Sequence, residues 1–219
     1  MTRSLLLAAC LLASACASAP GLRNVQVLDE GTVVRSGQPS ALGLAFLRDT
    51  YGVETVINLN QEGQDEEMVA AMALGLDYLP LPTGTYDLER ENLAVVIAAI
   101  RSAQARGRTP VLIHCRSGQD RTGTAVALFE IIEEGLSPEE AAAQMQAARH
   151  WTHRVAFPHL TRIALNEGIR EEVSEAAGSL EDIGIILPPD PWEAEPEAAP
   201  PGDVVLRSGL VVTTRPGIR

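Results

Sequence analysis

Short apolar runs rich in β-branched residues alternate along the chain with longer segments in which apolar residues recur at helical spacing. The runs predict strands and the longer segments predict helices, because side chains repeat every ~2 residues along a strand and every ~3.6 along a helix. The expected strands cover residues 25–28, 32–35, 54–59, 78–81 and 111–113, and the expected helices cover residues 40–51, 64–74, 88–106 and 122–134, followed by a capped helix from Pro138. This alternation predicts an α/β domain over residues 22–167, with a mainly parallel central sheet flanked by helices.

The C-terminal part of the chain differs in composition from the rest. Residues 171–203 contain ten acidic residues and no basic one, while the remaining chain has 19 acidic and 17 basic residues, so most of the net charge of −12 belongs to this segment. The Pro, Glu and Ala content of residues 187–202 is typical of a solvated linker. Residues 168–219 are therefore expected to form a flexible acidic tail with a possible terminal hairpin over residues 204–214. We expect no nucleic-acid partner, because polyanions bind basic surfaces. The composition does not identify a partner of the tail.

Residues 1–19 resemble a secretion signal. Arg3 precedes a short apolar stretch, and small residues lead up to Cys16 in the arrangement typical of bacterial lipoprotein signals. Such a chain is cut before the cysteine, so Cys16 would carry the lipid. The sequence predicts a periplasmic lipoprotein attached to the membrane by this lipid, and cleavage after Ala19 without lipidation is the alternative. No apolar run reaches the ~18 residues that a spanning helix needs.

Cysteine usage singles out Cys115. The chain has three cysteines, and Cys10 and Cys16 lie in the expected signal region. After cleavage and lipidation at Cys16, Cys115 has no partner for an intramolecular disulfide. A thiol that an exported protein keeps in an oxidising compartment is expected to have a chemical role.

The segment around Cys115 has the layout of an anion-binding loop. A buried strand ends at His114, a tight loop follows, and a helix begins near Arg121. The backbone N–H groups of such a loop converge on one point, and the positive end of the helix dipole adds to their charge. We expect this environment to stabilise the thiolate of Cys115 and to make it a nucleophile at neutral pH.

The other residues of this segment suit a tetrahedral phosphoryl group. Arg121 offers a planar fork of N–H donors to two oxygens. Gly118 permits the turn of the backbone, and the Thr122 hydroxyl is expected to hydrogen-bond the sulfur. The predicted phosphate-binding residues are Arg116, Ser117, Gly118, Gln119, Asp120, Arg121 and Thr122.

The pattern His-Cys-x-x-Gly-x-x-Arg-Thr over residues 114–122 resembles the signature of Cys-dependent protein tyrosine and dual-specificity phosphatases. Arg-Ser-Gly-Gln-Pro at residues 35–39 and Asp-Arg-Thr-Gly at residues 120–123 are similar to small bacterial and fungal members, above all to bacterial periplasmic dual-specificity phosphatases. The resemblance covers about residues 30–165. It implies a phosphatase-like fold, a phosphocysteine intermediate on Cys115, stabilisation of the transferring phosphoryl group by Arg121, and no metal or other cofactor.

Such chemistry also needs a general acid for the leaving oxygen. The resemblance implies an Asp on a loop about thirty residues before the cysteine, and Asp87 lies 28 residues before Cys115. Asp87 would also suit the N-cap of a helix that begins at Leu88, so both roles stay open. Asp120, inside the loop, is the rival acid, and its other possible role is to shape the loop by hydrogen bonding. His114 is expected to support the loop through a hydrogen bond.

The charges of the loop bear on the substrate. Asp120 and the uncharged Gln119 disfavour highly charged ligands, and Arg116 restores part of the balance. A phosphoprotein, with phosphotyrosine as the favoured residue, or a small phosphomonoester is the predicted substrate. An inositol polyphosphate is the alternative.

Arg35 and a group of histidines leave two further questions open. Arg35 either pairs with a carboxylate or lines the site. His150, His153 and His159 lie close together in the sequence, but exposed or capping histidines are far commoner than metal ligands, so no metal site is predicted.

Three other function classes use or retain a similar loop. A rhodanese-like sulfurtransferase also holds a cysteine in an anion-binding loop, although its loop is typically one residue shorter. Arsenate reduction needs resolving thiols, which this chain lacks, and a pseudophosphatase is expected to lack the Cys or the Arg. The leading prediction is an exported Cys-dependent phosphatase that hydrolyses phosphotyrosine or other phosphomonoesters.

Overall fold

The computed structural model describes residues 21–28, 31–86, 88–182, 204–205 and 211–212. The predicted signal peptide, the proposed lipidation site Cys16 and the candidate acid Asp87 lie outside the described residues, as does most of the tail.

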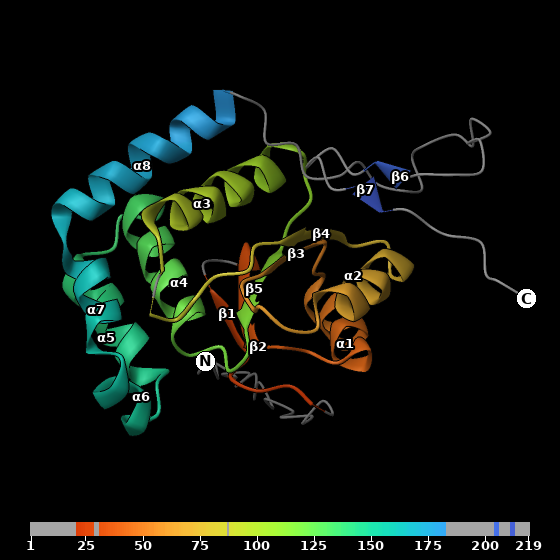
Figure 1. Cartoon of the computed structure of the whole chain (residues 1–219), viewed down its shortest axis with the longest axis horizontal. Helices are drawn as coiled ribbons and strands as arrows, with labels where there is room; N and C mark the ends of the chain where they lie inside the picture. Colours follow the sequence, from red (N-terminus) through yellow and green to blue (C-terminus); the bar gives the residue numbers. More distant parts are fainter. Residues whose placement is uncertain (1–20, 29–30, 87, 183–203, 206–210, 213–219) are drawn as a thin grey trace, which may run out of the picture.

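A five-stranded sheet forms the centre of the domain (Figure 1). Its strands are β1 (Gln26–Leu28), β2 (Val33–Gly37), β3 (Thr55–Asn58), β4 (Asp77–Pro80) and β5 (Val111–Cys115). The strand order is β1-β2-β5-β3-β4; β1 runs antiparallel to β2, and all the other pairs are parallel. The predicted α/β architecture with a mainly parallel sheet is therefore confirmed.

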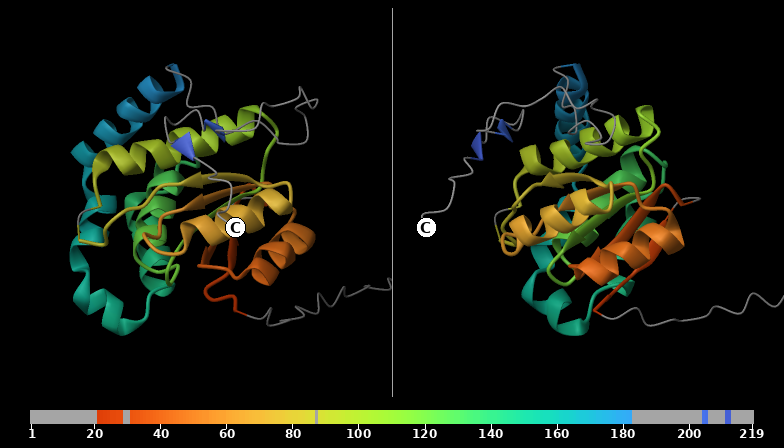
Figure 2. Two further views of the ribbon diagram at one scale, coloured as in Figure 1. Left: turned by 45° about the vertical axis from the view of Figure 1, so that its right-hand side comes forward. Right: turned by 90° about the vertical axis from the view of Figure 1, so that its right-hand side faces the viewer.

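Helices cover both faces of this sheet (Figure 2). They are α1 (Ala41–Tyr51), α2 (Gln64–Ala73), α3 (Arg90–Ala105), α4 (Arg121–Ile132), α5 (Pro138–Ala147), α6 (Trp151–Ala156), α7 (Pro158–Leu165) and α8 (Glu167–Asp182). The apolar core is divided by the sheet into two clusters, one facing α1 and α2 and the other facing α3, α4, α5, α7 and α8.

Successive side chains along a strand point to opposite faces of the sheet, so each strand contributes residues to both apolar clusters. On β5, Leu112 faces α1 and α2, while Val111 and Ile113 face the larger cluster. Val33 and Val34 on β2 divide between the two clusters in the same way. Because β5 lies between β2 and β3 and both its faces are covered, a continuous apolar run is what its position requires. The carboxyl ends of the four parallel strands meet at one edge of the sheet, which is where open α/β sheets place their ligands.

The capping residues in the sequence predicted the start of α5 correctly. Ser137 and Glu140 form the predicted capping box at the start of α5, with Pro138 at its first turn. The helix expected from Leu88 begins instead at Arg90, with Glu89 at its N-cap. The N-cap role considered for Asp87 falls on a residue outside the described ranges.

The folded part extends beyond residue 167, where the sequence predicted the tail to begin. Helix α8 packs along α3 and buries Val173 and Ala177 completely in the larger cluster, with Ile169 partly buried beside them. Arg90 and Glu172 form an ion pair between these two helices. The first 15 residues of the predicted tail, 168–182, are thus an integral helix of the domain.

Two further observations concern the chain outside this core. Strand β6 (Val204–Val205) pairs antiparallel with β7 (Val211–Val212), within the segment where a hairpin was expected. Among the helices of the described ranges, none combines the length and the apolarity that crossing a bilayer requires.

Candidate active site

The site is built on the loop between β5 and α4. Strand β5 ends at Cys115, and α4 begins at Arg121, so five residues make the connection. Cys115 is the free cysteine of the described chain and is 1% exposed. The N-terminus of α4, with its unpaired backbone donors, lies at the end of this loop. The strand, tight loop and helix predicted around Cys115 are all present.

The loop rests on the end of the neighbouring strand β2. The parallel register places Gly37 beside Cys115, and a Cβ on Gly37 would lie 3.2 Å from the backbone of Ser117. Gly118 adopts φ +72°, and a Cβ there would lie only 2.5 Å from the backbone nitrogen of Gly37. Both contacts exclude a larger residue, and the positive φ of Gly118 adds a second reason for glycine.

Arg35 supports the loop from within the protein. Its side chain is buried, and its NH2 group donates to the carbonyl oxygen of Gly118 at 2.8 Å. Burial lowers the pKa of Arg35, and the charges of Glu130 and Cys115 act in the opposite direction. Burial likewise raises the pKa of Glu130, and Arg35 opposes this shift. Arg35 therefore acts mainly as a buried support of the loop, which goes beyond either role that the sequence suggested for it.

Arg121 is held so that one edge of its guanidinium remains available. Its NH1 group donates to the carbonyl oxygens of Leu59 at 3.0 Å and Thr83 at 2.9 Å. The NH2 group makes one long contact of 3.4 Å with Asn60 Oδ1, and the buried Nε has no hydrogen-bond partner. A buried donor without a partner is energetically costly. The Nε–NH2 edge is therefore suited to donate to two oxygens of an oxyanion.

Thr122 and His114, which were expected to support Cys115 and its loop, are both buried in different environments. The Thr122 hydroxyl is buried and lacks a hydrogen-bond partner, so the expected bond to the sulfur is not formed in this structure. His114 is fully buried, and its Nε2 lies 2.5 Å from Glu67 Oε1 without hydrogen-bond geometry. The hydrogen bond expected from the His114 ring is therefore not formed, and the ring lies against a buried carboxylate instead.

Glu67 belongs to a buried polar network beneath the site. Its Oε2 accepts from Gln38 Nε2 at 3.1 Å and from Asn58 Nδ2 at 3.3 Å. Asn58 also donates to the hydroxyl of Tyr78 at 2.8 Å. Burial and the charge of Glu67 raise the pKa of Tyr78 well above its usual range. Asn60, which contacts Arg121, is tied to the same network through a 2.6 Å bond to Gln38 Oε1.

Asp120 links the loop to the segment around α6. Its Oδ1 lies 2.8 Å from Arg149 NH2, and its Oδ2 lies 2.5 Å from His153 Nδ1. Arg149 is completely buried and also donates to the carbonyl oxygens of His153 and Phe157. Both carboxylate oxygens of Asp120 are therefore engaged, an arrangement that favours its loop-shaping role over that of general acid.

The loop that carries Asp87 is attached to the site on both of its sides. Thr83 donates its hydroxyl to the carbonyl oxygen of Leu59 at 3.2 Å, and its own carbonyl accepts from Arg121. Tyr86 packs against Phe157 with ring centroids 5.2 Å apart and stacks on His159 at 6.3 Å. These contacts bring Thr83, four residues before Asp87, next to Arg121 and place Tyr86 against Phe157, while Asp87 itself is outside the described residues.

The remaining predicted phosphate-binding residues sit at the rim of the site. Arg116 is exposed. Asn24 Nδ2 donates to the carbonyl oxygen of Ser117 at 2.7 Å, and Gln119 Oε1 accepts from the backbone nitrogen of His150 at 2.6 Å.

The three histidines that lie close together in the sequence have other partners: His150 contacts Thr152, His153 contacts Asp120 and His159 contacts the Thr85 carbonyl. Within the part of the chain that is described, no three metal-binding side chains gather.

Sequence reasoning missed Asn60, Glu67 and Arg149. Each reaches the site from a segment far from the Cys115 loop, and none stands in a local motif. The only available signal was that a buried polar residue must have a partner, which does not say which partner it has.

We expect Gly118→Ala to disrupt the loop, because the added Cβ would clash with the end of β2 and occupy a left-handed backbone position. The free energy of unfolding should fall by about 2–4 kcal/mol, and binding of inorganic phosphate in calorimetry should be lost. Gly135→Ala is the matched control, since Gly135 has φ +71° and no atom within 4 Å of its Cβ position. It should cost about 1 kcal/mol and retain phosphate binding. Equal costs with binding intact in both variants would contradict this account of the loop.

Comparison with known proteins agrees with this geometry. The family model described as "PTP-SAK: Swiss Army Knife protein, DSP-PTPase phosphatase domain" matches residues 8–173. The dual specificity protein phosphatase TpbA of Pseudomonas aeruginosa is 32% identical over 116 residues, which cover 52% of this chain and 50% of TpbA. The chain thus matches about half the length of this curated relative.

Solved structures share the fold. A crystal structure of P. aeruginosa TpbA in complex with pTyr has a TM-score of 0.57 and 20% identity, covering 73% of this chain and 98% of that chain. The core catalytic domain of the PP-IP phosphatase SIW14 from S. cerevisiae, in complex with citrate, has a TM-score of 0.56 and 18% identity, covering 71% of this chain and 93% of that chain. Since the matched family model spans the sheet, the Cys115 loop and most of the helices around them, the chain belongs to the PTP-SAK family of DSP-PTPase phosphatase domains.

Proposed function

We propose that this protein is an exported Cys-dependent phosphatase that hydrolyses phosphotyrosine or other phosphomonoesters through a phosphocysteine intermediate. The main support is the arrangement of Cys115 and Arg121 around the loop. The cysteine ends a buried strand five residues before α4, and the arginine that begins α4 leaves its Nε without a hydrogen-bond partner and its NH2 group with one long contact. An oxyanion between them meets loop amides on one side and a guanidinium on the other.

The first step transfers the phosphoryl group to the protein. The Cys115 thiolate attacks phosphorus, so an S–P bond forms while the bond from phosphorus to the leaving oxygen breaks. Arg121 binds two of the transferring oxygens in a bidentate manner, and the loop amides bind the oxygens in the transition state. A general acid gives its proton to the leaving oxygen, which departs as the alcohol or phenol.

The second step releases inorganic phosphate. A water molecule attacks phosphorus, the residue that served as acid takes a proton from this water, and the S–P bond breaks to restore the thiolate. Water is the only co-reactant. Asp87 is our candidate for both proton transfers, because the neighbouring Thr83 is bonded to Arg121 and Tyr86 is packed against Phe157. Asp120 is the weaker candidate because both of its oxygens have partners.

Phosphotyrosine is the preferred substrate in this proposal. The similar fold of TpbA was crystallised with pTyr, which supports a phosphomonoester with an aromatic leaving group. An inositol polyphosphate is the second candidate, since the fold also resembles that of the SIW14 core, a PP-IP phosphatase. In this chain Asp120 and Gln119 add no positive charge to the loop, which disfavours the more highly charged ligand. The family assignment argues against a rhodanese-like sulfurtransferase.

Export and lipid attachment at Cys16 are also part of the proposal, and they rest on the sequence of residues 1–19 alone. Metabolic labelling with a lipid precursor tests them. Label should enter the wild-type protein and be absent from Cys16→Ala, whereas an unlabelled, processed wild-type protein would remove the membrane anchor from the proposal.

Turnover of p-nitrophenyl phosphate tests the chemistry. We expect the wild-type protein to hydrolyse it and vanadate to inhibit, because vanadate imitates the transferring group. Cys115→Ser should lose all turnover because it lacks the thiolate, and Arg121→Lys should lower kcat at least 100-fold because it lacks the bidentate donor edge. Arg101→Lys is the matched control and should keep full activity. Arg101 lies on α3 and forms an ion pair with Glu133. Turnover of thiosulfate in place of the phosphate ester would contradict the proposal.

Leaving-group dependence identifies the general acid. We expect Asp87→Asn to lower kcat/KM for phosphotyrosine by about 100- to 10,000-fold and to affect p-nitrophenyl phosphate much less, since a good leaving group needs little protonation. Asp120→Asn should affect both substrates to the same extent. It should also lower the free energy of unfolding by about 3 kcal/mol, because Arg149 would keep a buried and uncompensated charge. The opposite pattern would make Asp120 the acid.

A further inference from the structure

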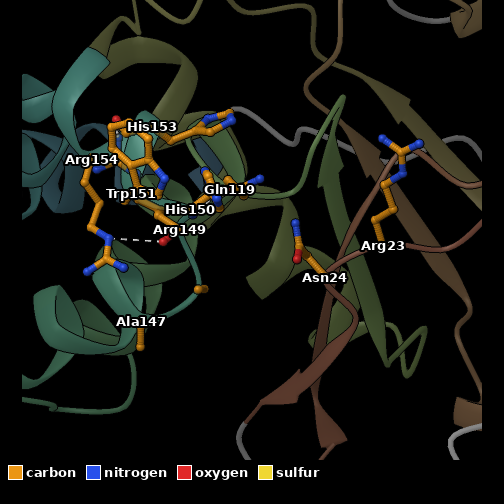
Figure 3. A pocket seen from close by; sticks show the side chains of 10 residues that line it. Arg23, Asn24, Gln119, Ala147, Arg149, His150, Trp151, His153 and Arg154 are labelled. Atoms are coloured by element: carbon orange, nitrogen blue, oxygen red, sulfur yellow. Dashed lines mark hydrogen bonds between the residues drawn. The ribbon is translucent and has the colours of Figure 1, made fainter.

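A groove of about 790 Å³ lies beside the phosphate-binding loop (Figure 3). Three segments far apart in the sequence line it: Arg23 and Asn24 before β1, Gln119 of the loop, and residues 147–154 around the start of α6. Its volume is comparable to that of pockets that hold ligands much larger than a single phosphoryl group.

Both walls of the groove are bonded directly to the loop. Asn24 donates to the carbonyl oxygen of Ser117 on one side. On the other side Gln119 accepts from the backbone of His150. The groove therefore adjoins the phosphate-binding loop, and Gln119 belongs to both.

The groove is basic, although the whole chain has a net charge of −12. Arg23 and Arg154 are exposed on opposite walls, and no ion pair joins either of them to a carboxylate of the described residues. Arg154 Nε donates to the carbonyl oxygen of Arg149 at 3.1 Å, which directs its side chain along the wall. Arg149 and His153 also line the groove, but both contact Asp120, whose carboxylate offsets the charge of Arg149. Two positive charges remain for a ligand.

An exposed tryptophan adds an apolar element to the same surface. Trp151 is 64% exposed, and the edge of its ring lies near His150, with ring centroids 5.8 Å apart. Tryptophan and arginine are the residues that contribute most often to binding energy at protein surfaces. A large exposed indole on the same helix as Arg154, α6, is therefore a candidate contact point.

We propose that this groove binds acidic residues that flank the phosphorylated tyrosine of a protein substrate. Arg23 and Arg154 pair with carboxylates of the peptide, and Trp151 packs against an apolar side chain of the same segment. The inference rests on the proposed function and specifies its substrate class as acidic phosphopeptides.

A peptide fits the groove better than a polyphosphorylated inositol does. An inositol polyphosphate is polar on all sides and offers no apolar surface to Trp151. The two arginines lie on opposite walls, which suits an extended chain that runs between them better than one compact polyanion. Charge complementarity at this site also favours encounter with acidic partners over neutral ones.

Two phosphotyrosine peptides test the groove. They share one sequence except that the flanking Glu residues of the first are Gln in the second, and p-nitrophenyl phosphate serves as the reference. We expect the full-length protein to prefer the acidic peptide. The double variant Arg23→Gln/Arg154→Gln should have a kcat/KM for the acidic peptide, relative to that for the reference, about three- to tenfold lower than the wild-type protein. The preference should weaken as ionic strength rises. Arg48→Gln/Arg162→Gln removes the same charge on α1 and α7 and should keep the preference.

Trp151→Ala separates the apolar contact from the charges. It should lower kcat/KM, relative to the reference, for both peptides alike, because the indole contacts a part of the peptide that the two share. An effect confined to the acidic peptide, or no effect, would overturn the role assigned to Trp151.

The outcomes distinguish this inference from the proposed function. Hydrolysis of the reference without preference between the peptides overturns the groove and leaves the phosphatase proposal intact. Absence of hydrolysis of all three substrates overturns both. A loss of inositol polyphosphate turnover in the arginine double variant, with peptide turnover unaffected, assigns the groove to a polyphosphate instead. If the arginine double variant raises peptide turnover of the full-length protein, and deletion of residues 183–219 raises it as well and removes this effect, the chain's own acidic segment is the occupant and the inference fails.

Discussion

One contact between two backbones supports the whole site, because the loop after β5 rests directly on the end of β2. Gly37 and Gly118 allow the two segments to approach more closely than any side chain would permit. Arg35, two residues before Gly37, then holds the carbonyl of Gly118 from the buried side. The expected convergence of the loop amides on one point depends on this position of the loop. The environment of Cys115 is therefore determined by β2 as much as by its own segment.

Arg121 supplies a second constraint, which joins the parts of the site that the sheet holds apart. Its NH1 group binds the loop after β3 through Leu59 and the loop after β4 through Thr83. The guanidinium that we propose to bind the phosphoryl oxygens is thus also bonded to Thr83, in the segment that precedes Asp87. Asp120 performs the corresponding task on the other side, where it connects the Cys115 loop to Arg149. Arg121 and Asp120 thus hold the loops of the site in position relative to one another.

The sequence was sufficient where structure is encoded locally. The β5 strand, its loop and α4 follow from a few adjacent residues, and the mainly parallel sheet follows the usual logic of alternating strands and helices. Partners from distant segments were not predictable, since nothing near Asp120 in the sequence indicates Arg149. Helix α8 was missed for a different reason. Its acidic composition suggested a solvated tail, while Ile169, Val173 and Ala177, spaced four residues apart, already marked a narrow apolar stripe that packs on α3.

The way in which Arg121 is anchored has a consequence for the evolution of such proteins. Two of its partners are main-chain carbonyls, at Leu59 and Thr83, and every residue type carries the same carbonyl. Neutral substitutions can therefore accumulate at these positions without loosening the arginine. An ancestral geometry of this kind can outlast most of the sequence that first specified it, and a fold shared with TpbA at 20% identity is compatible with such drift.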